Sequence, residues 1–396
     1  MIKISKKYTF LNIAIALFFM ATSIESIAIF EGFSIVKLSS LLVLIGWALQ
    51  GFSIKSSSML KCFVALAILA TFSILWAIDS VNTMGQVFRF LWPSIIVAFA
   101  MNSSIKTMRD IKLYLFAFVL GAMIATSATF LFREATLSMA EYASEERLSA
   151  FGQDQNTLAY LLCVAVTISL DFFRRTSRFL LKAICIAMIL AFVIAILSTG
   201  SRTGVIVTAF VFVLFMLSTS SIKTWITVVV VILLMAPIIY NYIPESMWNR
   251  FSETEELVSS GNFSDRGYIW SAGMQAFASE NMLLGVGYSN FSSMLQRHFG
   301  WQMASHNTYL SYLVDLGIVG LILFLIILCK MFLFCRQIKK VGGDIYIYAY
   351  IIPFLIVMFV LETEYKRWIF ILGVLLESYL RLQNSASENR IEANSR

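Results

Sequence analysis

One of the two histidines in the chain has a sequence context that suits proton transfer. His306 lies in SHNTYL at residues 305–310, directly before a long apolar segment. Imidazole is the side chain whose ordinary pKa lies nearest neutral pH, so His306 could remove a proton from an attacking hydroxyl group. It could also be a capping residue, because Asn307 and Thr308 resemble helix caps. We interpret His298, in QRHFGW, as an ordinary interfacial residue.

Two arginines have surroundings that suit an anionic ligand. Arg202 lies in STGSRTG at the junction of two apolar segments, and Arg266 lies in SDRGYIW within a long polar stretch. The planar guanidinium group offers paired donors that match phosphate oxygens. Small residues beside Arg202 would let a phosphorylated head group approach closely. Alternatively, Arg202 could be an interfacial anchor, and Arg266 could be a solvated partner of Asp265.

A third polar group precedes another apolar segment. Gln153, Asp154 and Asn156 stand in FGQDQNTLA, where they could bind a sugar, although capping of the following helix is favoured. The sequence contains no HExxH, DxD or P-loop motif, and its five cysteines form no CxxC pair. We therefore expect neither a metal ion nor a cofactor. A cytoplasmic nucleotide-sugar transferase is disfavoured for the same reason.

Membrane-spanning helices must position these residues. Hydrophobic residues make up 59% of the 396 residues and charged residues only 13%, against about 25% charged in a soluble domain. This composition excludes a disordered chain, a nucleic-acid-binding module and an ordinary soluble enzyme. Segments of about 20 apolar residues can span a bilayer. We expect an all-α polytopic bundle forming one membrane domain over residues 1–396, with about twelve spans. The segments cover approximately residues 8–29, 35–52, 62–78, 85–101, 113–132, 157–172, 183–199, 204–219, 224–240, 308–329, 345–361 and 368–382.

The charges predict how these spans are oriented. With the N-terminus inside, about 20 of the 30 basic residues fall on the cytoplasmic side, and most acidic residues fall outside. Both termini are therefore predicted to be cytoplasmic, and two long connections at residues 133–156 and 241–307 are predicted to be external. The second joins spans nine and ten. Within it, apolar residues recur at helical spacing from Gly267 to Phe277.

Charges within the spans distinguish an enzyme from a transporter. Arg89 is the only clear intramembrane charge, and it could pair with Asp315 of the tenth span. A transporter would need a charged path through the spans, so an enzyme is favoured. A short charged turn at residues 362–367 either rims the external site or is a solvated hairpin.

The order of these motifs resembles the O-antigen ligase and polymerase superfamily. The motifs are an Asn before a mid-chain span, SRTG at a span junction, RGYIW in a long external connection, then LLGVGYSNF and HNTYLSYLVDLGIVG. The resemblance covers residues 145–330, a ligase-like core. The resemblance implies a bundle of about twelve spans in the bacterial inner membrane, with a large periplasmic loop over the active site. It also implies a metal-independent glycosyltransferase that uses a polyprenyl-pyrophosphate-linked glycan as donor.

The resemblance also implies roles for individual residues. Arg202 and Arg266 would hold the pyrophosphate, and His306 would be the catalytic histidine. Further possible substrate-binding residues are Asn156, Asn307, Arg250 and Arg147. The acceptor would be lipid A–core in a ligase, another lipid-linked unit in a polymerase, and a serine or threonine in a protein O-oligosaccharyltransferase. The ligase is slightly favoured over the polymerase.

Overall fold

A computed structural model describes most of the chain. The description covers residues 8–25, 28–30, 33–132, 148–151, 153–219, 264–362 and 367–394, together with residues 222, 223, 225, 226, 230 and 237. The elements are α1 (Phe10–Thr22), β1 (Ala28–Phe30), β2 (Phe33–Ser34), α2 (Ile35–Ala48), α3 (Ser58–Phe72), η1 (Ser73–Leu75), α4 (Ser80–Gln86), η2 (Val87–Leu91), α5 (Trp92–Ser104), α6 (Met108–Leu131), α8 (Gln155–Arg175), α9 (Phe179–Ser198), α10 (Arg202–Ser218), α13 (Ser264–Phe277), α14 (Phe291–Phe299), α15 (Thr308–Lys340), η3 (Ile345–Tyr350), α16 (Ile352–Val357) and α17 (Trp368–Asn394).

The protein is a helical multi-pass membrane protein. Among the described residues, six helical stretches are long and apolar enough to cross a membrane: Ser58–Leu75, Ser80–Ser104, Met108–Leu131, Gln155–Arg175, Phe179–Ser198 and Thr308–Lys340. Other apolar helices are shorter. The 13 residues of α1 extend about 20 Å, less than the roughly 30 Å hydrocarbon core. Eleven predicted segments overlap observed helices, and most of the ninth, at 224–240, lies outside the described residues. The number of twelve spans remains a prediction.

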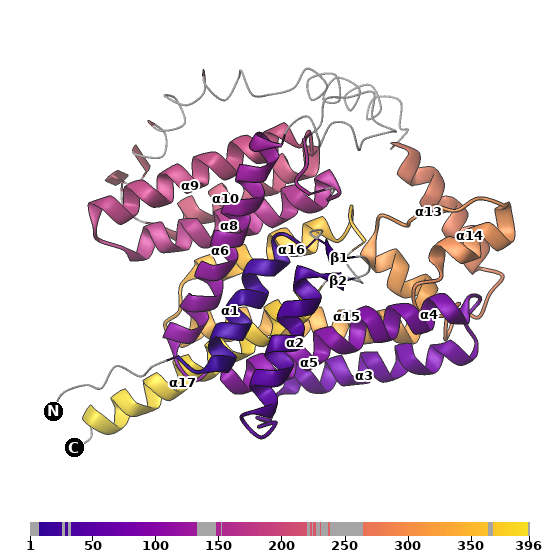
Figure 1. The fold of residues 1–396 in the computed structure, drawn as a ribbon, viewed down its shortest axis with the longest axis horizontal. Helices are drawn as coiled ribbons and strands as arrows, with labels where there is room; N and C mark the ends of the chain where they lie inside the picture. Colours follow the sequence, from indigo (N-terminus) through magenta and orange to yellow (C-terminus); the bar gives the residue numbers. More distant parts are fainter. Residues whose placement is uncertain are drawn as a thin grey trace.

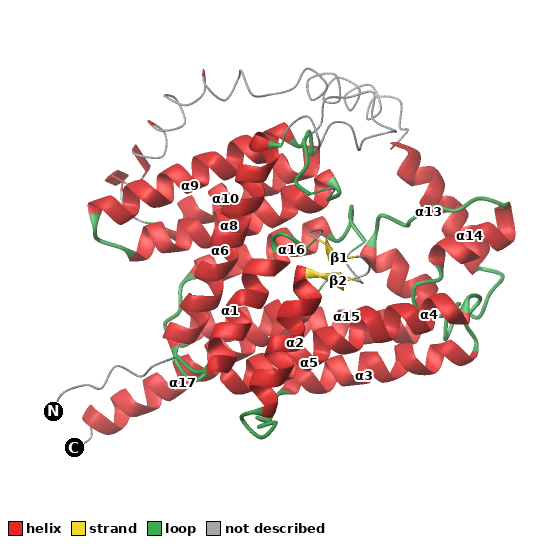
Figure 2. Ribbon diagram, in the orientation of Figure 1, coloured by secondary structure: helices red, strands yellow, loops and turns green. Residues whose placement is uncertain are grey.

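The first apolar segment departs from the expectation of one long helix. The helix α1 ends at Thr22, and the chain then forms a small antiparallel hairpin in which Ala28 pairs with Ser34. β-Branched Ile29 and aromatic Phe30 favour extended backbone there. The predicted helix over 8–29 is therefore wrong in its last third. The fold is helical with this one hairpin in the part of the chain that the structure describes (Figure 2).

The helices α8 and α10 pack closely because small residues face each other. A Cβ atom on Gly204 would lie 2.8 Å from the Cβ of Ala159, which is closer than real side chains allow. The thiol of Cys163 reaches the Gly204 carbonyl at 3.3 Å and the Thr208 hydroxyl at 3.1 Å. Small residues let membrane helices approach each other in this way. Gly204, one of the small residues beside Arg202, thus serves helix packing.

The long helix α15 is interrupted where it runs beside α3 (Figure 1). Gly317 has φ 67° and ψ −168°, a conformation that is essentially restricted to glycine. The carbonyls of Val314 and Asp315 instead accept hydrogen bonds from the amides of Val286, at 3.0 Å, and Gly287, at 2.8 Å. Irregular backbone is tolerated at membrane depth where protein groups satisfy it. The segment after α13 supplies those groups here.

The same segment is fixed on its other side by the residues around α4. Asn82 donates from Nδ2 to the Ser289 carbonyl at 2.7 Å. The buried Asp315 carboxylate accepts the amides of Ser289, at 3.0 Å, and Asn290, at 2.9 Å. Arg89 is exposed, so the predicted pairing of Arg89 with Asp315 is replaced by these backbone contacts.

The long connection predicted at 241–307 contains two helices in its described part, α13 and α14. The helix expected from Gly267 to Phe277 is confirmed as α13. These helices share a small hydrophobic core with the first half of α15, formed by Ile269, Ala272, Ala276, Phe277, Val286, Phe291, Met294, Leu295, Leu310 and Val314. The connection is therefore folded against the bundle, and its position relative to a membrane remains a prediction.

Candidate functional site

The turn before α10 brings two of the predicted residues close together. Arg202 is the first residue of α10, and Ser201 is its N-cap. The Ser201 hydroxyl accepts the Gly204 amide at 3.2 Å and donates to Oδ1 of Asn156 at 2.9 Å. Gly200 has φ 63°, which completes the tight turn. Asn156 on α8 is thereby fixed beside half-buried Arg202.

The polar group before α8 divides into two roles. Asp154 is the N-cap of α8, and its Oδ1 accepts the Thr157 amide at 2.8 Å. This is the capping role that the sequence favoured. Asn156 has a different role, because its Oδ1 accepts a hydrogen bond from the hydroxyl of Ser201, the N-cap of α10. Among the contacts of the described residues, the Nδ2 group of Asn156 has no hydrogen-bond partner, so it remains able to donate.

His306 lies in a turn directly before α15. The residue is half-buried and has φ 48°, in the left-handed region that side chains other than glycine seldom adopt. Asn307 is the N-cap of α15, and its Oδ1 accepts the Leu310 amide at 3.1 Å. The predicted cap at Asn307 is therefore present. His306 itself stands outside the helix, where its ring does not serve as the cap.

The connection between α16 and α17 holds the His306 turn in place. One oxygen of Glu362 accepts the Ser305 amide at 3.0 Å, the Ser305 hydroxyl at 2.8 Å and the Ser311 hydroxyl at 3.2 Å. The Thr308 amide donates to the Met358 carbonyl at 2.8 Å. Bonds to a carboxylate are stronger than neutral ones. Glu362 thus holds the Ser305 backbone before His306 and the Ser311 side chain after it.

The charged turn predicted at 362–367 is not a solvated hairpin at its described ends. Glu362 lies at the candidate site, as the preceding contacts show. Arg367 is buried and forms an ion pair with Glu25, with Nη1 and Oε1 2.5 Å apart. This pair ties the start of α17 to the end of α1.

The helix α13 reaches the same turn from another direction. Trp270 donates from its indole nitrogen to the Ser305 carbonyl at 2.9 Å. Arg266 stands four residues earlier, on the same face of α13. On another face of α13, exposed Tyr268 stacks on Trp301, with ring centroids 5.8 Å apart and an interplanar angle of 25°. Arg266 and an aromatic surface are therefore carried on the element that contacts the His306 turn.

The described contacts arrange the predicted residues in two groups. Asn156 and Arg202 form one, and His306, Asn307 and Arg266 belong to the other. The two are linked by α16, which packs on α10 and leads into the turn that holds Ser305 and Thr308.

Several assignments fall outside these two groups. The remaining predicted arginines, at positions 147 and 250, lie outside the described residues. His298 pairs with Glu280, with Nε2 and Oε1 2.8 Å apart, which fits a structural role. Within the ranges that the structure describes, no three His, Cys, Asp or Glu side chains gather in a way that could hold a metal ion.

One region of the chain resembles a known protein family. Residues 186–325 match the family model described as O-antigen ligase. This region, about a third of the chain, is similar to the O-antigen ligase family. This match confirms the resemblance to the O-antigen ligase and polymerase superfamily. No curated protein matches the chain.

The matched region contains Arg202, Arg266 and His306, whereas Asn156 and Glu362 lie outside it. The sequence placed Glu362 in a charged turn without a definite contact, and it indicated Trp270 only as an apolar residue of the predicted helix. Glu362 is an acidic residue directly after an apolar segment, and this position is the feature of the sequence that could have indicated its role.

Proposed function

We propose that this protein is a membrane glycosyltransferase that moves a glycan from a polyprenyl-pyrophosphate carrier to an acceptor hydroxyl group, without a metal ion. The observation that carries the proposal is the O-antigen ligase domain match, which includes Arg202, Arg266 and His306. The site geometry supports it, because His306 stands in a turn fixed by α13, by α15 and by the connection after α16.

The reaction needs charge stabilisation on one side and proton removal on the other. The bond between the anomeric carbon and the pyrophosphate oxygen breaks as the acceptor oxygen attacks from the opposite face, so the anomeric configuration inverts. The leaving pyrophosphate gains negative charge, which Arg202 and Arg266 would bind more tightly as it develops. The neutral imidazole of His306 would take the proton of the acceptor hydroxyl.

The local structure adds further donors for an anionic substrate. Arg202 begins α10, and the amides at a helix N-terminus favour negative charge. The Nδ2 group of Asn156 stands beside this turn. Asn307 uses Oδ1 for capping, which leaves its Nδ2 group as a donor next to His306. Asn156 would contact the donor substrate and Asn307 the acceptor.

The description of the matching family favours one class of acceptor. We favour an O-antigen ligase that acts on lipid A–core. A polymerase joining lipid-linked repeat units is the second candidate, because the superfamily motifs are shared between the two classes. A protein O-oligosaccharyltransferase and a lipid-linked glycan flippase rank below them, and we expect no nucleic-acid partner.

The test is transfer by the purified full-length protein in detergent. The donor is a polyprenyl-pyrophosphate-linked glycan, supplied with or without lipid A–core and with or without EDTA. We expect glycan on lipid A–core, with EDTA having no effect. Longer lipid-linked chains formed without lipid A–core would identify a polymerase. Activity that EDTA abolishes and a divalent cation restores would contradict the proposal, as would the absence of transfer to either acceptor.

We further propose that the protein lies in the bacterial inner membrane with both termini in the cytoplasm and the site on the periplasmic side. The distribution of basic residues supports this orientation. A reporter that is active only outside the cytoplasm should work when fused after Ser260 and fail when fused after Gly342. The reverse pattern would place the site in the cytoplasm and would contradict the assignment.

A further inference from the structure

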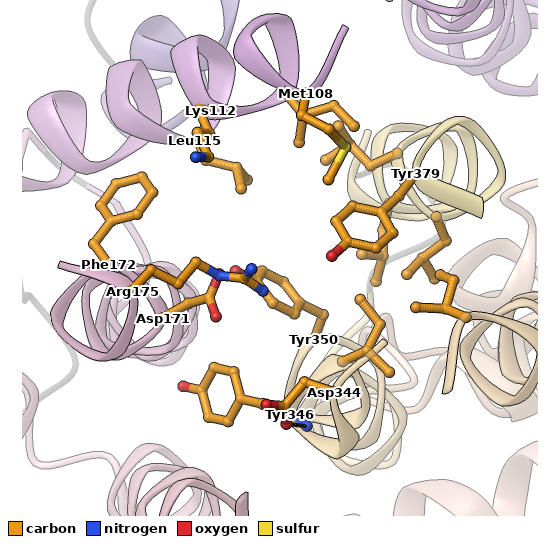
Figure 3. A pocket seen from close by; sticks show the side chains of 16 residues that line it. Met108, Lys112, Leu115, Asp171, Phe172, Arg175, Asp344, Tyr346, Tyr350 and Tyr379 are labelled. Atoms are coloured by element: carbon orange, nitrogen blue, oxygen red, sulfur yellow. Dashed lines mark hydrogen bonds and ion pairs between the residues drawn. The ribbon is translucent and has the colours of Figure 1, made fainter. Parts of the chain in front are cut away.

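A pocket with a charged mouth lies at the opposite end of α8 from Asn156. It is enclosed by α6, α8, η3 and α17. Figure 3 shows Lys112 and Leu115 reaching from α6, Arg175 from α8 and Tyr379 from α17 toward one open centre. None of the residues predicted for glycan transfer lines it. The pocket is therefore separate from the candidate transfer site.

An apolar slot adjoins this pocket and extends toward the middle of the bundle. The two cavities share walls at Leu115, Tyr350 and Leu372. On α8 the slot is lined from Ile168 to Tyr160, and the wall of the adjoining pocket continues to Arg175. The two cavities together therefore cover an axial separation of about 22 Å along α8 at 1.5 Å per residue. The remaining walls of the slot are mostly aliphatic and aromatic. The combined length of the two cavities and the apolar lining of the slot suit one fatty acyl chain.

The ion pairs at the mouth of the pocket leave N–H groups of two cationic side chains able to donate hydrogen bonds. Asp171 is neutralised by Arg174, at 2.9 Å, and by Nε of Arg175, at 2.8 Å, while Asp344 pairs with Arg174. Arg175 is 44% exposed, and its two Nη groups have no hydrogen-bond partner among the described residues. Lys112 is also exposed and has no described partner. Both acids are thus paired, and an ammonium group and a guanidinium fork remain for an anion.

We propose that this pocket binds an anionic phospholipid, with its phosphate held by Lys112 and Arg175 and one acyl chain in the apolar slot. Basic pockets between membrane helices bind anionic lipid head groups in this manner. The Tyr379 hydroxyl accepts from Gln383 at 3.2 Å, which leaves its hydrogen to donate to a phosphate oxygen. The site belongs to the leaflet opposite the candidate transfer site, and the proposal does not depend on the transfer reaction.

The experiment measures lipid binding to the purified full-length protein in a non-ionic detergent. Native mass spectrometry counts retained lipids, and thermal unfolding measures stabilisation. Phosphatidylglycerol should bind and raise the unfolding midpoint by about 2–4 °C, whereas phosphatidylcholine should do neither. Lys112→Gln should weaken phosphatidylglycerol binding about five-fold, the value of one basic contact near a lipid surface. Leu372→Trp should fill the slot and abolish binding.

The matched control is Lys340→Gln, which makes the same charge change at an exposed residue outside the pocket. It should keep wild-type affinity. Inorganic phosphate at the same concentration should leave the unfolding midpoint unchanged. Equal binding of the two lipids would overturn the proposal, and so would unchanged affinity in Lys112→Gln. Stabilisation by inorganic phosphate that Lys112→Gln removes would assign the pocket to free phosphate instead.

Discussion

The turn that carries Arg202 and the turn that carries His306 are stabilised in different ways. The first is largely local: a serine cap closes it, and one bond to Asn156 joins it to the neighbouring helix. The second is assembled from residues distant in the chain, because Trp270 contacts it from one side and Glu362 from the other. The first turn therefore tolerates changes elsewhere, whereas the second depends on three elements at once.

This difference suits the two tasks that we assign to these turns. A pyrophosphate presents several oxygens, so an arginine fork at a helix start needs only approximate placement. Proton transfer requires the imidazole to lie within hydrogen-bond distance of one hydroxyl group. Tighter, non-local support at His306 is consistent with that stricter requirement. The following predictions test whether the two turns act separately.

The largest effect is expected at the non-local turn. His306→Ala should lower the rate of glycan transfer by about two to four orders of magnitude, the usual contribution of general acid–base catalysis. His306→Gln should be similarly inactive, because an amide cannot accept the proton efficiently. His298→Ala is the control and should remain close to wild type. Near wild-type turnover in His306→Ala would remove this residue from the mechanism.

The next effect is expected at the local turn. Arg202→Lys keeps the charge but loses the paired donors, so transfer should fall about 100-fold while the protein accumulates normally. Assays with saturating donor and western blots of membranes measure the two quantities. Arg178→Lys, at an exposed position away from the turn, should have no effect. Full activity in Arg202→Lys would favour an interfacial anchor at this position.

A smaller effect should follow from loosening the His306 turn alone. Glu362→Gln replaces a carboxylate acceptor with a weaker neutral one, so kcat should fall about ten-fold. The KM for the lipid-linked donor should stay unchanged, because the Arg202 turn is held independently. Glu280→Gln, which weakens only the contacts with His298 and Arg297 away from this turn, is the matched control. A changed donor KM with unchanged kcat would show that Glu362 acts on the other turn.

The smallest effect on transfer is expected from a substitution at the contact between α8 and α10, where the stability of the protein is the quantity measured. Gly204→Ala would place a methyl group 2.8 Å from Ala159, so unfolding in detergent should require about 1–3 kcal/mol less free energy. Gly85→Ala, whose added methyl group meets open space, should not destabilise the protein. Thermal unfolding followed by circular dichroism compares the two. Equal stability of both variants would mean that α8 and α10 adjust freely.

The sequence predicted the helical membrane fold because spanning segments must be long and apolar. It also predicted α13, whose apolar residues recur at helical spacing, and the cap at Asn307. It did not predict the break at Gly317, since a glycine inside an apolar run is compatible with an unbroken helix. The break depends on hydrogen bonds from a distant segment, and those are not visible in local patterns.

The candidate site shows the same limit. The types and neighbours of Arg202 and His306 identified them as candidates, because side-chain chemistry is a local property. The bond between Asn156 and Ser201 depends on which helices are neighbours, and the bonds of Glu362 depend on where the chain returns after α16. Neither arrangement can be derived from spacing within a single segment.

The break in α15 has a consequence for how the protein is made. The carbonyls of Val314 and Asp315 are satisfied by amides of the 286–287 segment only after the two parts have docked. Before docking, the lipid would leave those carbonyls without partners, so the segment should enter the bilayer as one continuous helix. The break then forms during assembly. A synthetic peptide of residues 308–340 in micelles should accordingly be helical through Gly317, and the His306 turn should be among the last parts of the protein to mature.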